Sequence, residues 1–400
     1  MKIRFRQSDV LNAARRMEDN TFHGGLSDCP YGLTTIASRY GKPNAKPPRS
    51  NRGRDGAFGR LTRGFMNQQW DSEVPSVEVW RELLRVCRPG AMFLSFGHPR
   101  TFHRLICNME DAGWEIRDVI AWIYGSGFPK THHDISQDID KYLGATRRIV
   151  GHRKHTAKFK KANNGGFNDP SRKCYPITAP ATWQAKQWAG HGISLKPAWE
   201  PILVAMKPRD GSYAHNALTW GVAGMNIEAS RLPYQNGENP TVAGRGRHGR
   251  GKGYGSKPQG DTLTVNPNGR LPSNLLLDEE AASFLGPPAR FFYCAKASKR
   301  EKEAGLGTSN SNPCIKPLDL CRYLARLILP PDQDDPRRLI VPYSGTGSEM
   351  IGAMLAGWDE VTGIEQHPGY ISEAQGHIRY WHQYRHEILD RSPAMKGPQQ

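Results

Sequence analysis

The stretch LIVPYSGTGSEMIGAMLAGWDEVTGIEQHPGY, residues 339–370, contains the features that decide the fold. Its apolar, largely β-branched start predicts a buried strand over residues 339–341. A glycine turn follows, and we expect a helix over residues 350–358 with Ser348 as its N-cap. A second apolar run predicts another strand over residues 361–364. A strand, a turn, a helix and a second strand form the unit from which doubly wound α/β sheets are built.

The same stretch has the parts of a site for a nucleotide ribose. Gly345 and Gly347 allow backbone N–H groups to approach a ligand, and Glu365 follows the first glycine by about 20 residues. A dinucleotide fingerprint needs a third glycine where Met350 stands, whereas S-adenosyl-L-methionine has a ribose but no pyrophosphate. The spacing therefore favours S-adenosyl-L-methionine. The alternative is an ordinary α/β protein with a surface glutamate at this position.

The composition favours a polyanionic partner. The chain has 400 residues, with 55 Lys and Arg against 38 Asp and Glu, and its formal net charge is +17. This surplus creates a positive field that favours nucleic acid, although a basic protein without such a partner can have the same composition. No apolar run approaches the roughly 18 residues of a membrane span, and residues 1–10 are not a signal peptide. We therefore expect a cytoplasmic protein without a membrane segment.

The cysteines give no sign of a disulfide framework or of a structural metal site. The seven are scattered, odd in number and contain no Cys-x-x-Cys pair. This pattern suits a reducing cytosol, and we expect the protein to work without a metal.

A second motif lies in residues 26–32, LSDCPYG. Asp28, Cys29, Pro30 and Tyr31 place a carboxylate, a rigid backbone and an aromatic ring in one tight turn. Because Pro30 has a fixed φ and no N–H, the preceding carbonyl and the Asp28 carboxylate are held ready to accept hydrogen bonds.

The turn over residues 28–31 resembles the Asp-Pro-Pro-Tyr catalytic motif of the DNA amino-methyltransferases. Residues 339–365 resemble the S-adenosyl-L-methionine motif of that family, and residues 312–317 resemble its helix-opening segment beside the cofactor. The order of the three motifs is that of the β-type members. Residues 64–130 resemble one group within the family that is common in phages and prophages.

The resemblance implies a doubly wound, Rossmann-like sheet with inserted target-recognition regions. It implies site-specific transfer of a methyl group from S-adenosyl-L-methionine to the exocyclic amine of a flipped base in double-stranded DNA. Adenine N6 is favoured because the motif begins with Asp. The catalytic residues would be Asp28, Cys29, Pro30 and Tyr31. The cofactor-binding residues would be Lys316, Tyr343, Ser344, Gly345, Thr346, Gly347, Ser348 and Glu365.

Four departures from the family pattern keep other interpretations open. The segment His-Gly-Gly, residues 23–25, precedes Asp28 where the family has an apolar strand. Cys29 replaces a proline, Asn312 replaces a histidine, and Val341 replaces an aspartate that in the family contacts the methionine part of the cofactor. Cys29 keeps the backbone carbonyl that the chemistry needs, and we expect its thiol to pack rather than to act as a nucleophile. The alternatives are a cytosine-N4 DNA methyltransferase, an RNA methyltransferase of the same fold, and a catalytically inactive DNA-binding relative.

Further alternation of helices and strands predicts the rest of the core. We expect helices within residues 8–19, 75–86, 101–112 and 317–328, and strands over residues 91–96, 118–122 and 202–205. We expect a turn over residues 20–25, and Pro89 and Gly90 should stop the helix that precedes them.

The chain divides by composition into core parts and inserted parts. The predicted divisions are a catalytic part (1–130), a basic insertion (131–195), a core strand (196–207), a target-recognition region (208–290), a cofactor-binding part (291–390) and a tail (391–400). Three basic segments, residues 34–64, 147–161 and 244–257, favour contacts with phosphates.

Overall fold

The computed structural model describes residues 1–32, 73–125, 134–154, 174–234, 266, 268–295, 301, 304–305 and 315–386. The chain forms two compact units, Met1–Gly125 with Trp199–Gln400, and Ser126–Ala198. The predicted basic segments 34–64 and 244–257 lie outside the described residues, as do residues 312–314 of the helix-opening segment.

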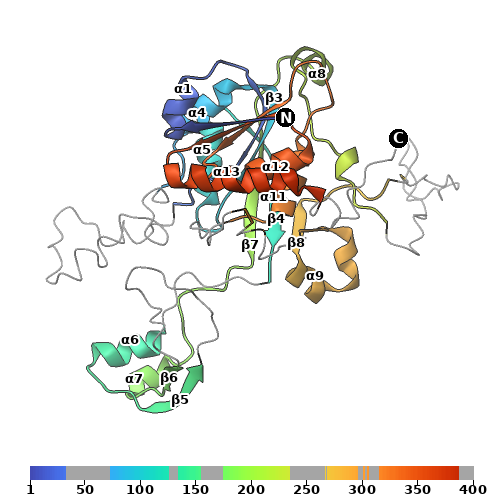
Figure 1. Cartoon of the computed structure of the whole chain (residues 1–400). Helices are drawn as coiled ribbons and strands as arrows, with labels where there is room; N and C mark the ends of the chain where they lie inside the picture. Colours follow the sequence, from blue (N-terminus) through green and yellow to red (C-terminus); the bar gives the residue numbers. More distant parts are fainter. Residues whose placement is uncertain are drawn as a thin grey trace, which may run out of the picture. The chain divides into compact units, whose positions relative to one another are not determined.

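The described part of the larger unit is built on a nine-stranded sheet with the strand order β1-β11-β10-β2-β3-β7-β4-β8-β9 (Figure 1). The strands are β1 Lys2–Gln7, β2 Phe22–Ser27, β3 Cys87–Phe96, β4 Glu115–Ile123, β7 Trp199–Met206, β8 Leu275–Asp278, β9 Tyr293–Ala295, β10 Arg338–Pro342 and β11 Glu360–Glu365. Neighbouring strands are parallel, except that β7 is antiparallel to both β3 and β4. The predicted strands at 91–96, 118–122, 202–205, 339–341 and 361–364 are all confirmed within these bounds.

Helices cover both faces of this sheet, which confirms the doubly wound α/β class (Figure 1). On one face lie α1 Val10–Arg15, α4 Val77–Val86 and α5 Phe102–Asp111; on the other lie α11 Leu318–Leu327, α12 Ser348–Ala356 and α13 Pro368–Gln383. Leu339 and Val341 pack with the second group and Ile340 with the first, as the two-residue period of a strand requires. The larger unit also contains α8 Tyr213–Trp220, α9 Glu279–Leu285 and two 3-10 helices, η4 Glu228–Ser230 and η5 Pro287–Phe291.

The smaller unit has a polar centre. It contains α6 Ile135–Tyr142, α7 Trp183–Gln187 and the antiparallel strands β5 Ile149–Lys154 and β6 Cys174–Thr178. The carboxylate of Asp140 is fully buried and accepts hydrogen bonds from Arg147 Nη1 and Thr182 Oγ1, each over 2.7 Å. The hydrogen-bonded carboxylate of Asp140 thus connects α6 to Thr182 at the start of α7. It also connects α6 to Arg147, which lies two residues before β5.

The predicted turn over residues 20–25 is wrong for its last four residues, which belong to β2 in the middle of the sheet. All six residues of β2 are buried. A Cβ on Gly25 would lie 2.2 Å from Cε2 of Phe93, and one on Gly24 would lie 3.2 Å from Cη2 of Trp358. The two glycines therefore allow large aromatic rings to pack closely on both faces of the strand, whereas in the sequence they resemble a loop.

Two predicted element boundaries are also wrong. α4 ends at Val86 as predicted, but β3 begins at Cys87 and not at residue 91, so that Pro89 and Gly90 lie inside the strand, where its pairing with β2 is irregular. Gly90 has φ +76° and donates its N–H to Lys207 O over 3.0 Å, which keeps the strand connected across the irregularity. α12 begins at Ser348, two residues earlier than predicted, and its N-cap is Gly347 at φ +92°. Ser348 is thus the first helical residue, because the left-handed backbone at Gly347 already turns the chain into the helix.

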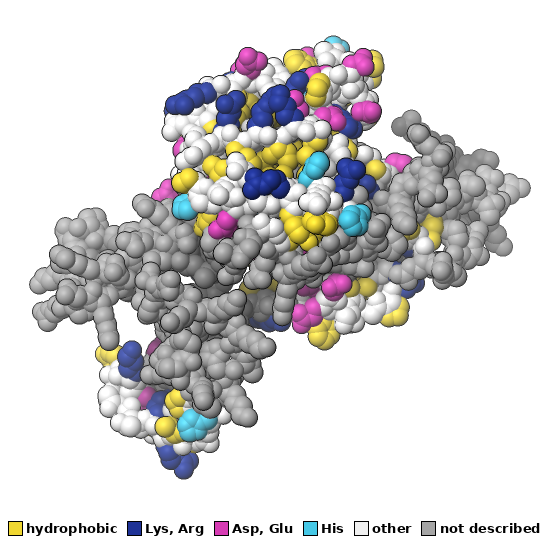
Figure 2. Space-filling model, in the orientation of Figure 1, with side chains coloured by type: hydrophobic (Ala, Val, Ile, Leu, Met, Phe, Trp, Pro, Cys, Tyr) yellow, Lys and Arg dark blue, Asp and Glu magenta, His cyan; other side chains and the backbone are white. Residues whose placement is uncertain are grey.

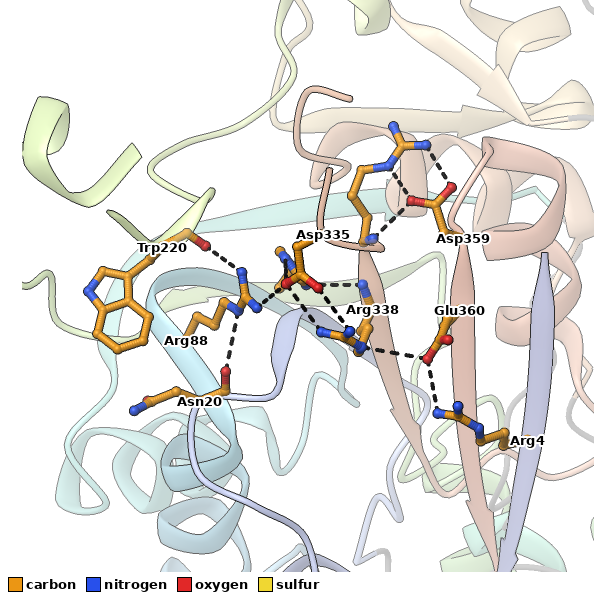
Figure 3. Close-up of polar contacts among 10 residues, drawn as sticks. Arg4, Asn20, Arg88, Trp220, Asp335, Arg338, Asp359 and Glu360 are labelled. Carbon is orange, nitrogen blue, oxygen red and sulfur yellow. Dashed lines mark hydrogen bonds and ion pairs between the residues drawn. The ribbon is translucent and has the colours of Figure 1, made fainter. Parts of the chain in front are cut away.

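Ion pairs join the amino-terminal ends of β10 and β11 (Figure 3). Arg338 Nη2 lies 2.9 Å from Asp335 Oδ1, and Arg88 pairs with the same aspartate. Glu360 forms an ion pair with Arg4 over 2.9 Å, and its Oε2 lies 3.6 Å from Nε of Arg338, which connects the two strands. Arg338 and Glu360 are the first residues of their strands, so this network lies at the opposite end of the strands from the site described next.

Candidate active site

The carboxyl ends of β2, β10 and β11 lie side by side, because β10 pairs with both of the other strands. The chain passes from β10 to β11 in one direction along the sheet and from β2 to β3 in the other. Ligands of doubly wound sheets bind at such a switch point. Asp28 follows β2, the glycine turn follows β10, and Glu365 ends β11. The fold therefore brings the two sequence motifs to one place.

Asp28 is the centre of a compact polar cluster. Lys316 Nζ donates to Asp28 Oδ2 over 2.8 Å and to Tyr31 Oη over 2.7 Å, and Tyr31 donates to Asp28 Oδ1 over 2.8 Å. Glu200 Oε2 lies 3.4 Å from both Lys316 Nζ and Tyr31 Oη. Burial, followed by the charge of Asp28, raises the pKa of Tyr31 well above its usual value, so its hydroxyl remains a donor. We predicted that Lys316 lies beside the cofactor. In the structure its ammonium group contacts Asp28, the predicted catalytic carboxylate.

The turn that holds Asp28 is fixed by contacts with β3 and with Thr101 at the start of α5. Cys29 is buried, and its Sγ lies 3.4 Å from Ser95 Oγ and 3.5 Å from the carbonyl of Phe96 in β3. Thr101 Oγ1 donates to the carbonyl of Tyr31 over 2.6 Å. The thiol of Cys29 thus faces the sheet interior, which is the packing role predicted for it.

The glycine turn is tied to the carboxyl end of β11. Glu365 Oε2 accepts the N–H of Gly345 over 3.0 Å, and its Oε1 accepts the N–H of His367 over 2.8 Å. Ser344 donates its N–H to Ile364 O over 3.0 Å. Glu365 therefore supports the turn directly, and each of its oxygens keeps a second lone pair for a ligand.

The backbone of this turn has an unusual conformation. Tyr343 has φ +58°, rare for a residue other than glycine, and Gly345 and Gly347 have φ +48° and +92°. Such conformations gather at binding and catalytic sites, where the surrounding structure maintains them. Burial raises the pKa of Tyr343, and Thr346 O lies 3.1 Å from Nδ1 of His377 on α13. The Ser344 hydroxyl is buried and has no hydrogen-bond partner among the described residues.

Sequence reasoning missed two acids of this site. Glu200 was part of a segment read only as the approach to a strand, and its partners come from distant parts of the chain. Glu349 is the second residue of α12 and is 4% exposed. Its position, four residues after Gly345, was the signal that could have identified it. Among the described residues, no group of three or more His, Cys, Asp or Glu side chains is arranged to hold a metal ion. In the same part of the chain, no helix has the length and apolar character needed to cross a membrane.

Known proteins resemble this chain in their solved structures and not in their sequences. No protein-family model matches the chain, and no curated protein sequence matches it. Among solved structures, the cytosine-N4-specific PvuII DNA methyltransferase is 9% identical with a TM-score of 0.44, covering 98% of this chain and 92% of its own. M1.HpyAVI is 10% identical with a TM-score of 0.38, covering 94% and 98%. TTHA0409 from Thermus thermophilus is 14% identical with a TM-score of 0.37, covering 95% of each chain. At such identities and TM-scores, none of these likenesses says which reaction this chain performs.

Proposed function

We propose that the chain is an S-adenosyl-L-methionine-dependent DNA methyltransferase that modifies an exocyclic amino group, with adenine N6 as the target. The observation that carries the proposal is the juxtaposition of Asp28 and the glycine turn with Glu365 at the switch point of the sheet. Asp28 can accept hydrogen bonds from an amine, and the glycine turn with Glu365 can bind a nucleotide ribose. Both arrangements come from the residues whose types and spacing resemble the amino-methyltransferase motifs.

The residues at the glycine turn fit this cofactor. Glu365 is positioned to accept hydrogen bonds from ribose hydroxyls, and the hydroxyl of Ser344 has no partner among the described residues. The first N–H groups of α12 point out of the helix start and favour polar ligand groups. We assign Lys316, Tyr343, Ser344, Gly345, Thr346, Gly347, Ser348 and Glu365 to the cofactor side of the site. When bound, the cofactor supplies an electrophilic methyl group on a sulfonium.

Asp28 and the carbonyl of Cys29 would prepare the amine of the base. The lone pair of an aromatic amine is delocalised into the ring, and hydrogen bonds from both amino hydrogens to these acceptors concentrate it on nitrogen. Lys316 and Tyr31 already donate to Asp28, and a carboxylate has lone pairs for a further donor. Lys316 also offsets the adjacent charges of Asp28 and Glu200. The chain's part in the reaction is therefore positioning and electrostatics.

The base must leave the duplex to reach this cluster, at a cost of a few kcal/mol. The ring of Tyr31, whose centroid lies 5.8 Å from that of His98, offers an aromatic surface beside Asp28 on which a flipped base can stack. Pro30 is buried in the same turn and fixes the backbone that holds both groups.

The charge of the chain supports DNA as the partner. The net charge is +17, and Figure 2 shows Lys and Arg side chains interspersed with Asp and Glu on the part of this face that the structure describes. Eight of the basic residues belong to segment 34–64. The ends of the stretch that contains it are adjacent, since a Cβ on Gly32 would lie 2.8 Å from the N atom of Val74. Gly32 and Val74, which are described on either side of the stretch, therefore lie next to each other, and Gly32 directly follows Tyr31. We assign target recognition to residues 208–290 and further phosphate contacts to the basic insertion 131–195.

The proposal is tested by methyl transfer from labelled S-adenosyl-L-methionine to duplex DNA, followed by nucleoside digestion and mass spectrometry. We expect N6-methyladenine with the wild type and no transfer with Asp28→Ala, whose cofactor affinity should stay near that of the wild type. Glu110→Ala, which removes an exposed carboxylate on α5, is the matched control and should keep full turnover.

Other outcomes of this experiment distinguish the alternatives. N4-methylcytosine without N6-methyladenine would overturn the choice of base but keep the mechanism. Transfer to RNA and not to duplex DNA would overturn the choice of nucleic acid. DNA binding without transfer or cofactor affinity would indicate a catalytically inactive relative.

A further inference from the structure

The carboxyl group of Glu349 is enclosed at the place where α12 begins against α11. The two helices approach closely at their backbones, since a Cβ on Gly352 would lie 2.5 Å from the backbone carbonyl carbon of Cys321. The thiol of Cys321 contacts Glu349 Oε1 at 4.0 Å, a weak hydrogen bond. Only 4% of Glu349 is exposed, so bulk water has little access to its carboxyl group. The side chain is fixed in place by packing, directly after the glycine turn.

The charges around Glu349 are unbalanced. Burial, followed by the negative charge of Asp28, raises the pKa of Glu349 to about 8, against the opposing effects of its own backbone N–H and of Lys316. Lys316 is already shared by Asp28, Glu200 and Tyr31. Among the described residues of this cluster, Asp28, Glu200 and Glu349 supply three carboxyl groups against the one ammonium group of Lys316, and a further cation would be stabilised beside Glu349.

A second group of the same turn also points to a ligand. The hydroxyl of Ser344 is 1% exposed and has no hydrogen-bond partner among the described residues. It lies close to Gly363 of β11, together with the sulfur of Met350, the residue after Glu349. An enclosed hydroxyl without a hydrogen-bond partner among the described residues and an enclosed carboxyl are therefore placed on the glycine turn and on the first turn of α12.

We propose that Glu349 binds the ammonium group of the methionine part of S-adenosyl-L-methionine. This inference rests on the proposed function, and it assigns one cofactor contact to a residue outside the glycine motif. The ammonium group supplies the positive charge that the cluster lacks, and its hydrogen-bond donors match a carboxylate. Glu349 releases its proton to the buffer when the ammonium group binds, so that a neutral carboxyl group becomes the anionic partner of an ion pair.

The first test compares two ligands by isothermal titration calorimetry. S-Adenosylhomocysteine retains the ammonium group, whereas 5′-methylthioadenosine retains adenosine and lacks the amino-acid part. Glu349→Gln should weaken S-adenosylhomocysteine roughly 10- to 100-fold, the range for a lost bond to a charged group, and leave 5′-methylthioadenosine unchanged. Glu365→Gln, the matched control, should weaken both ligands because both contain the ribose. Glu349→Ala is the second variant should the glutamine variant fail to fold.

The second test uses the wild type alone. Titrations with S-adenosylhomocysteine at pH 6.5, in two buffers of different ionisation enthalpy, measure the protons released on binding. We expect about one proton per ligand, because Glu349 is protonated in the free protein and ionised in the complex. The same ligand should release none from Glu349→Gln.

The outcomes separate this inference from the proposed function. Equal losses for both ligands in Glu349→Gln, unchanged affinity for S-adenosylhomocysteine, or binding without proton release would each overturn the role of Glu349. In those cases wild-type binding of S-adenosylhomocysteine would still support the proposed function. Wild-type protein that binds neither ligand would overturn the proposed function and this inference together.

Discussion

Lys316 donates from its Nζ to Asp28 Oδ2 over 2.8 Å, although 288 positions separate the two residues in the chain. Lys316 lies just before α11 and Asp28 just after β2, so the contact forms only when the sheet has assembled. Both side chains are largely buried, with 7% and 15% exposure. The pair therefore connects the two motifs and makes the stability of the site depend on its charges.

Lys316→Met should destabilise the protein strongly. The substitution leaves Asp28 and Glu200, each 15% exposed, close together without the ammonium group that lies between them. Breaking a buried pair by removing one partner costs about 3–5 kcal/mol of unfolding free energy. Urea denaturation measures it, with Lys316→Arg as the control that keeps the charge. A loss below about 1 kcal/mol, the value of a surface pair, would contradict this description of the cluster.

Glu365→Ala should weaken the binding of S-adenosyl-L-methionine roughly 10- to 100-fold, because hydrogen bonds to a charged group are lost. The variant also removes the acceptor of the Gly345 N–H, which loosens the glycine turn. Calorimetric titration of the variant and the wild type measures the effect. An unchanged dissociation constant would make Glu365 a support of the turn without a role in the cofactor site.

The elements that the sequence predicted well are those with a local signal. Residues 339–341 form a continuous apolar run, and this is what a strand buried on both faces needs. β2 lacked that signal, because Gly24 and Gly25 are required by Phe93 and Trp358, which come from other parts of the chain. Lys316, Glu200 and Glu349 likewise contact residues that are distant in the chain, and the fold must be known before these partners can be named. Residue types therefore predict a role for Asp28, whereas the side chains that surround it required the three-dimensional structure.

Gly25→Ala should cost about 1–3 kcal/mol of stability, the usual cost of overpacking a core. The new methyl group would lie 2.2 Å from Cε2 of Phe93, a fully buried ring that has little room to move. The change is measured as a shift in the midpoint of urea unfolding.

Gly224→Ala is the matched control for this substitution, since a Cβ there has nothing within 4 Å. It should leave the midpoint unchanged or raise it slightly. Combining Gly25→Ala with Phe93→Leu should cost less than the sum of the single changes, because the smaller side chain makes room for the methyl group. Additive losses would show that the contact between Gly25 and Phe93 does not limit packing.

His23→Asn should make the protein less sensitive to acid. The buried imidazole accepts the N–H of Arg338 through Nδ1 over 3.0 Å, and burial, followed by the charge of Arg88, lowers the pKa of His23 from 6.5 to about 3. Between these two values the unfolded chain binds a proton that the folded protein excludes. The contribution of neutral His23 to the free energy of unfolding is therefore fully present above pH 6.5. It is lost as the pH falls toward 3, by at most about 1.4 kcal/mol per pH unit.

The asparagine side chain can accept the same backbone N–H but does not titrate, so the variant should lose roughly 2 kcal/mol less than the wild type between pH 6.5 and 5. Urea unfolding of both proteins at these two pH values measures the difference. All other residues are the same in both proteins, so their contributions cancel in the comparison. Equal losses on acidification would mean that His23 accepts a proton in the folded protein, which would contradict its role as a buried acceptor for the first residue of β10.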